Sequence, residues 1–154
     1  MPSTNDIVTI EDFFEQVKGY LNEAQIDYVR KAYILAADAH KEQRRKSGEP
    51  YIIHPIGVAN ILAGLQMDEY TLAAAFLHDV VEDTEYTYDD IRNIFGGVVA
   101  NLVDGVTKLG KIAYISKEDR QIENYRKMFL AMARDIRVVL IKLADRLHNM
   151  RTMK

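Results

Sequence analysis

The stretch "TLAAAFLHDVVEDT", residues 71–84, decides the fold because its first half is apolar and its second half is crowded with ionisable groups. Up to the histidine it has the composition of a helix inside a hydrophobic core. Four ionisable residues then follow within six positions: His78, Asp79, Glu82 and Asp83. On a helix that advances about 100° per residue, these side chains share an arc of about 140°. The stretch therefore predicts a buried helix with one polar patch at its carboxyl-terminal end.

The rest of the chain is also predicted to be helical. Only three prolines and eight glycines interrupt it, and no alternating run of polar and apolar residues is long enough to require a strand. Two capping boxes, Thr9 with Asp12 and Thr87 with Asp90, predict helix starts. The helices expected from these signals cover residues 13–21, 24–40, 55–65, 69–81, 88–95, 98–109, 118–133 and 136–154, with a surface loop at residues 110–117. The expected architecture is all-α, an irregular helical bundle.

Composition limits the classes of protein to which the chain can belong. Its 154 residues are enough for one domain with a substantial core. The net charge of −3 argues against binding long nucleic acids, and no apolar run approaches the length of a membrane span. The absence of cysteine excludes disulfides and thiolate metal ligands, and it suits a cytoplasmic protein. The closing "HNMRTMK" lies in a helical pattern with no terminating glycine or proline, which predicts a fragment of a longer protein.

The polar patch on residues 78–83 needs a partner if it is buried. Carboxylates in a core require hydrogen bonds or an opposite charge, and no basic residue lies beside these in the sequence. A metal ion would satisfy them, because it lets histidine remain neutral and aspartate remain ionised. One buried ionisable group is often only a satisfied core residue. Four on one arc of an apolar helix favour metal binding or catalysis.

The final helix offers a matching set of polar residues in "LIKLADRLHNMRT". Its core stripe is expected to consist of Leu140, Leu143, Ala144, Leu147 and Met150, with Asp145 at the edge of that stripe. Asn149 and Thr152 follow Asp145 at i+4 and i+7, so the three side chains lie along one line. We expect Asp145 to bind a metal and the other two to face a ligand beside it.

His54 is the remaining candidate ligand. Pro55 is expected at the first position of its helix, which places His54 at or just before the N-cap. Two histidines with Asp79 and Asp145 suit one ion of Mn²⁺, Fe²⁺ or Zn²⁺ better than Ca²⁺. His54 by itself is more often a capping residue than a ligand. His40 is expected in the core or behind the ligands, and His148 either supports a ligand or makes a structural hydrogen bond.

The segment "QRRKSGEP", residues 43–50, is a second feature of interest. A run of charge such as Arg44, Arg45 and Lys46 is usually only a solvated loop. Because it closely precedes His54, however, it must lie near any site that this histidine helps to form. Arginine can stack on a base and lysine can bind phosphate, so the loop could attract an anionic ligand to a negatively charged chain.

Together these motifs resemble the HD superfamily of metal-dependent phosphohydrolases. Four segments, "RKSGEPYIIHPIGVA", "AAFLHDVVEDT", "LVDGVTKLGKI" and "IKLADRLHNMRT", are similar to the hydrolase domain of RelA/SpoT-type (p)ppGpp synthetase/hydrolases. The resemblance covers the chain from about residue 20, and the set of motifs is highly specific. It implies a helical bundle of the HD-domain type at the N-terminus of a longer multidomain enzyme, with synthetase and regulatory domains that lie outside these 154 residues.

The resemblance also implies an activity and a role for each matching residue. The family hydrolyses (p)ppGpp to GDP or GTP and pyrophosphate, and it requires Mn²⁺. Metal ligands would be His54, His78, Asp79 and Asp145, while Glu82 and Asp83 would act near the attacked phosphate. Residues that contact the nucleotide would be Arg45, Lys46, Ser47, Asn149 and Thr152. Relatives without hydrolase activity lose the His-Asp and Glu-Asp pairs, and both pairs are kept here.

Two alternatives remain open from the sequence. One is an HD-type phosphohydrolase that acts on another nucleotide, which a panel of substrates would distinguish. The other is a regulatory module that binds nucleotide or metal without catalysis. It predicts no turnover, and no loss of function when Glu82 and Asp83 become alanine. No direct nucleic acid or membrane partner is expected in any of the three cases.

Overall fold

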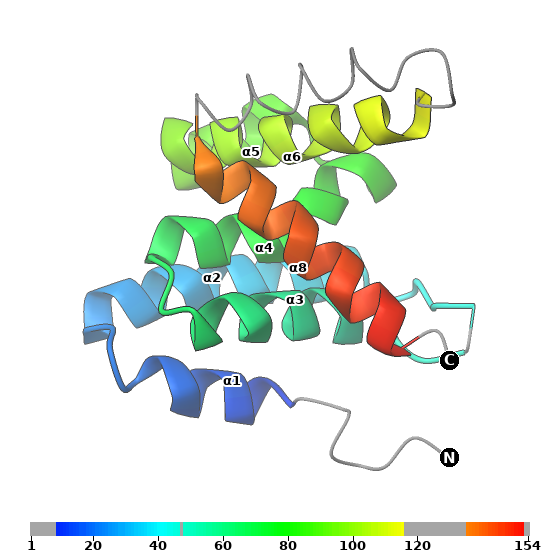
Figure 1. Ribbon diagram of the computed structural model, residues 1–154. Helices are drawn as coiled ribbons and strands as arrows, with labels where there is room; N and C mark the ends of the chain where they lie inside the picture. The colour runs from blue at the N-terminus through cyan, green and yellow to red at the C-terminus, as the bar shows by residue number, and fades with distance from the viewer. Residues whose placement is uncertain (1–8, 47, 116–134, 153–154) are drawn as a thin grey trace.

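The computed structural model describes residues 9–46, 48–115 and 135–152, and these residues form helices joined by short connections (Figure 1). The helices are α1 (Ile10–Val17), α2 (Glu23–Ala39), α3 (Ile53–Gly64), α4 (Glu69–Asp83), α5 (Tyr88–Phe95), α6 (Gly97–Ile115) and α8 (Ile136–Thr152). Within the described ranges there is no strand, only an isolated bridge between Arg44 and Pro50. The predicted all-α class is confirmed.

Helix α4 lies at the centre of the bundle. All of its residues from Thr71 to Val80 are buried, including the histidine and aspartate of the opening stretch. It packs against α2, α3, α6 and α8, and α8 also crosses α3 and α6 (Figure 1). An ion pair between Arg137 and Asp68, 2.9 Å apart, joins the start of α8 to the start of α4. Helices α3 and α8 thus pack against α4 and against each other.

Helix starts follow local capping chemistry. Thr9 with Asp12 and Thr87 with Asp90 form the two predicted capping boxes. A third box, with Asn22 as the cap of α2, was not predicted, although it has the same physical basis because its amide oxygen accepts a hydrogen bond from a free backbone N–H.

Three predicted helix boundaries are wrong. Helix α1 covers Ile10–Val17 instead of residues 13–21, because Gly19 N and Tyr20 N bond to Gln16 O and Val17 O in a turn that ends the helix. Helix α3 begins at Ile53 instead of Pro55, because a turn already carries hydrogen bonds from Ile53 N to Pro50 O and from His54 N to Tyr51 O. His54 therefore lies inside the first turn. The loop predicted at residues 110–117 is wrong through Ile115, since α6 continues to that residue; an isolated glycine costs a helix only about 1 kcal/mol. The last two loop residues and the helix predicted at 118–133 lie outside the described residues.

The predicted core stripe of α8 is only partly right, since Ala144 is buried and Leu140 packs partly buried against the core. The buried face carries Val138, Val139, Ile141, Ala144, Asp145 and His148, whereas Leu143 is 59% exposed and Met150 is 70% exposed. Leu143, Leu147 and Met150 are exposed beside this face, so hydrophobicity alone placed the stripe at the wrong rotation of the helix. The buried face is the one on which Asp145 and His148 both contact His54 of α3, and these polar contacts fix the rotation of α8.

Candidate metal centre

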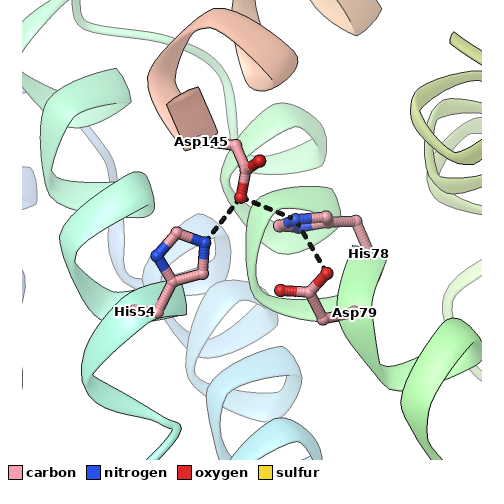
Figure 2. A group of neighbouring side chains, drawn as sticks. All are labelled: His54, His78, Asp79 and Asp145. Atoms are coloured by element: carbon pink, nitrogen blue, oxygen red, sulfur yellow. Dashed lines mark hydrogen bonds and ion pairs between the residues drawn. The ribbon is translucent and has the colours of Figure 1, made fainter. Parts of the chain in front are cut away.

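Four buried side chains from three helices converge inside the bundle (Figure 2). His54 comes from the first turn of α3, His78 and Asp79 from α4, and Asp145 from the buried face of α8. Each offers one ligand atom, and these atoms all lie within 4.8 Å of one another. The structure thus brings together the four residues that the sequence nominated as metal ligands.

The closest contacts in this cluster join histidine nitrogens to carboxylate oxygens. His54 Nε2 lies 2.5 Å from Asp145 Oδ1, and His78 Nε2 lies 3.4 Å from the same oxygen. His78 Nε2 is also 3.2 Å from Asp79 Oδ1 (Figure 2). One oxygen of Asp145 therefore faces both imidazoles, an arrangement that would suit a shared cation.

His78 gives the most direct indication that the cluster fits a metal. Its Nδ1 lies 2.8 Å from the carbonyl oxygen of Ala75, so Nδ1 carries the hydrogen and donates it. Its Nε2 is buried and makes no hydrogen bond with any group in the described part of the chain. In the neutral ring this nitrogen presents its lone pair to the cluster, as a metal ligand does when its other nitrogen is held by a backbone carbonyl.

The electrostatics of the cluster reflect an excess of buried negative charge. Burial opposes the charged form of His78, but the carboxylate of Asp79, and then that of Asp145, outweigh burial and raise the pKa of His78 to about 9. Burial likewise disfavours ionised Asp145, yet its contacts with His54 and His78 lower the pKa of that carboxyl well below its usual range. Without a metal the cluster therefore retains a proton, which a bound cation would replace.

Residues behind the ligands contact the atoms that point away from the cluster. His54 Nδ1 lies 2.7 Å from His148 Nδ1, and Lys142 Nζ lies 3.5 Å from Asp145 Oδ2. The His148 ring packs directly on the backbone of α3 at Gly57, where any side chain would overlap it. Burial, followed by the nearby His54 and Arg45, lowers the pKa of His148 to about 4. A neutral His148 can accept the hydrogen of His54 Nδ1, which would leave His54 Nε2 free to bind a metal.

Glu82 and Asp83 lie one turn beyond the ligands of α4, where the helix reaches the surface. Burial, and then the charge of Asp79, raise the pKa of Glu82 above its usual value. Asp83 instead accepts a hydrogen bond of 3.4 Å from Gln43 Nε2. The two acids thus differ: Asp83 is held by Gln43 from the loop before α3, whereas the pKa of Glu82 is raised by burial and then by the charge of Asp79.

The loop before α3 contacts α8 beside the cluster. Arg45 Nη2 donates to Asn149 Oδ1 at 3.1 Å, which joins two of the predicted nucleotide contacts. Arg45 Nη1 is buried, with no hydrogen-bond partner in the described ranges. Lys46 is exposed, and the Thr152 hydroxyl bonds within α8 to the carbonyl of His148. Ser47, the remaining predicted contact, lies outside the described residues.

Sequence reasoning missed several residues that support the cluster. Tyr51 donates to Asp79 at 2.5 Å, and Gln43 joins His40 to Asp83. Nothing in the spacing of Tyr51 distinguishes it from an ordinary loop aromatic, because its partner lies 28 residues away. His40 is buried, as expected, and belongs to the surroundings of the cluster and not to the ligand set.

A model of the family described as HD domain matches residues 32–154, which is more than half of the chain.

The chain belongs to the HD domain family.

Relatives place this HD domain among SpoT-type proteins. It is 55% identical over 143 residues to the bifunctional (p)ppGpp synthase/hydrolase SpoT of Escherichia coli strain K12, covering 93% of this chain and 20% of that protein. It is 51% identical over 140 residues to a GTP pyrophosphokinase of Myxococcus xanthus, covering 89% of this chain and 18% of that protein. The HD domain therefore spans about a fifth of the length of these curated relatives.

A solved structure gives the same assignment. It is described by the words "A metazoan ortholog of SpoT hydrolyzes ppGpp and plays a role in starvation responses". This HD domain matches it with a TM-score of 0.62 and 33% identity, covering 86% of this chain and 71% of that one. The predicted bundle of the HD-domain type is thus confirmed. Among the described helices, none combines the length and hydrophobicity needed to cross a membrane.

Proposed function

We propose that this HD domain is a Mn²⁺-dependent 3′-pyrophosphohydrolase of (p)ppGpp. The observation that carries the proposal is the buried group of His54, His78, Asp79 and Asp145, with Glu82 and Asp83 at its edge. Relatives at 50–58% identity that bear the name guanosine-3′,5′-bis(diphosphate) 3′-pyrophosphohydrolase support the same substrate.

The four cluster residues would hold one Mn²⁺ ion through two imidazole nitrogens and two carboxylates, a donor set that suits this metal. A bound ion of this kind supplies Lewis acidity at phosphate oxygens and lowers the pKa of water. The proton now retained on His78 would leave as the ion binds, and the Ala75 carbonyl would keep the ring oriented throughout.

Glu82 is proposed as the general base. The pKa of Glu82 is raised toward neutral pH, which makes its carboxylate a stronger proton acceptor. The water oxygen bonds to the phosphorus next to the 3′ oxygen, and the bond from that phosphorus to the ribose oxygen breaks. Pyrophosphate is released, and the 3′ oxygen acquires a proton, which balances the proton that Glu82 removes from the water. Asp83, which Gln43 restrains, would orient the water or the phosphate.

The loop before α3 would bind the nucleoside end of the substrate. The contact between Arg45 and Asn149 places a guanidinium beside the cluster, with its Nη1 still available for a partner. A guanidinium can stack on a purine base, and Lys46 and Ser47 would be the contacts to phosphate. Thr152 lies one turn beyond Asn149 on α8. Precise placement of the substrate is a major source of rate enhancement in phosphoryl transfer.

The test is turnover of ppGpp with added Mn²⁺, alongside GTP and other nucleotides. Because the relatives are about five times longer, the chain is assayed both alone and in place of the 143 matching residues of Escherichia coli SpoT. Glu82→Gln is expected to reduce turnover by about 10²–10⁴-fold, and His78→Ala to abolish it. Glu69→Gln, at the opposite end of α4, is the matched control and should leave turnover unchanged. Undiminished turnover in both site variants would refute the assignment.

A further inference from the structure

Tyr51 belongs to the same loop before α3 as Arg45, and it contacts Asp79 through the carboxylate oxygen that is not the one next to His78. Its hydroxyl is 2.5 Å from Asp79 Oδ2, while Asp79 Oδ1 is 3.2 Å from His78 Nε2. The two oxygens of this carboxylate therefore have different partners. One is directed to a residue outside the cluster, and the other is directed into it.

The direction of this hydrogen bond follows from chemistry. An ionised carboxylate can only accept, so the phenol must donate and must remain protonated. Burial and the negative charge of Asp79 raise the pKa of Tyr51 above its usual value, which keeps the phenol in its donor form. A hydrogen bond from a neutral donor to a charged acceptor is among the stronger kinds in proteins.

Tyr51 is itself held in place from several sides. Its backbone N–H donates to the carbonyl of Gln43 at 3.0 Å, and its carbonyl accepts from the N–H of His54 at 2.9 Å. Its ring lies 4.8 Å from the His40 ring and 5.9 Å from the His54 ring, measured between centroids. A group can orient a ligand only if its own position is fixed, and these contacts fix the phenol.

We infer that Tyr51 is a positioning residue of the metal centre, whose hydroxyl holds Asp79 so that Oδ1 is the oxygen offered to the ion. The role rests on the proposed ligand set and does not require that the substrate be (p)ppGpp. Without the hydroxyl, the Asp79 carboxylate is free to rotate about its Cβ–Cγ bond. Binding an ion must then immobilise the carboxylate, and the lost rotational entropy weakens the affinity for the ion. Residues that orient metal ligands in this way commonly change metal affinity by about 10–100-fold when they are removed.

The test is the affinity of the 154-residue chain for Mn²⁺, measured by calorimetry or by the electron paramagnetic resonance signal of free Mn²⁺, without nucleotide. Tyr51→Phe removes one oxygen and keeps the ring. Tyr20→Phe is the matched control, because the Tyr20 hydroxyl also donates one partly buried hydrogen bond, of 2.8 Å to the Met67 carbonyl, away from the cluster. Tyr51→Phe should bind Mn²⁺ about 10–100-fold more weakly, and Tyr20→Phe within about twofold of the unaltered chain.

Equal affinity in Tyr51→Phe and the unaltered chain would overturn the inference, as would an equal loss in Tyr20→Phe. Turnover of ppGpp by Tyr51→Phe should recover when Mn²⁺ is raised to saturation. A loss that persists at saturation would overturn the positioning role, because the hydroxyl would then take part in the reaction. A chain that binds Mn²⁺ less tightly after Tyr51→Phe, yet never hydrolyses ppGpp, would support the positioning role and refute the proposed function.

Discussion

The pH dependence of metal binding gives a quantitative test of the cluster. The carboxylates of Asp79 and Asp145 raise the pKa of His78 to about 9, so this ring is protonated at neutral pH in the absence of a metal. A metal binds only the neutral ring, and the proton must therefore be released as the ion enters. Affinity should rise as pH rises toward 9 and fall as pH falls, by up to about tenfold per unit for one displaced proton.

From pH 8 to pH 6.5 the affinity for Mn²⁺ should therefore drop about 30-fold. Calorimetric titrations in buffers with different protonation enthalpies measure both the affinity and the number of protons released, which should be close to one. Glu82→Gln is the control, because Glu82 is a nearby carboxyl whose pKa is also raised, and the proton should still be released in this variant. An affinity that is constant over this range, with no proton released, would refute the reasoning.

Three further predictions concern packing and stability. Gly57→Ala should weaken Mn²⁺ binding about tenfold or more, because the added carbon displaces the His148 ring from His54, whereas Gly64→Ala on the same helix should not; equal affinities would contradict this. Mn²⁺ at about a hundred times its dissociation constant should raise the free energy of unfolding, measured by chemical denaturation, by about 2.7 kcal/mol. An unchanged denaturant concentration at the midpoint of unfolding would contradict a metal site that exists only in the folded chain. Ile141→Ala should lower the free energy of unfolding by about 2–5 kcal/mol, because Ile141 is buried, and Met150→Gln by less than about 0.5 kcal/mol, because Met150 is exposed. Similar losses in the two variants would refute the observed rotation of α8.

The sequence was most informative where apolar and ionisable residues lie next to each other in one helix. In α4 the apolar residues and the ionisable residues are adjacent, so helical geometry alone places the polar patch. The capping boxes at Thr9 and Thr87 were equally recognisable, since both partners lie three residues apart. In each case the relevant contacts are local, and local contacts can be predicted from spacing.

Features that depend on distant partners were not predictable in this way. The rotation of α8 depends on contacts of Asp145 and His148 with His54, more than 90 residues earlier in the chain. Leu143 and Met150 are as apolar as any core residue, and nothing in their own neighbourhood indicates that they are exposed. Asp145 was nonetheless placed with the other candidate ligands, because its carboxylate follows the apolar residues Leu143 and Ala144 at the edge of the predicted stripe.

The origin of the four cluster residues has a topological consequence. His54 and Asp145 are 91 residues apart, so an ion held by both would close that part of the chain into a ring, in a sequence that has no cysteine to do so. Such a closure restricts the unfolded chain, as a long-loop disulfide does. Helices α1 and α2 precede His54 and lie outside the ring, whereas α4, α5 and α6 lie within it and α3 and α8 supply its two closing residues. The ion would act as a reversible cross-link, and the protection that it adds against opening would be concentrated in these five described helices.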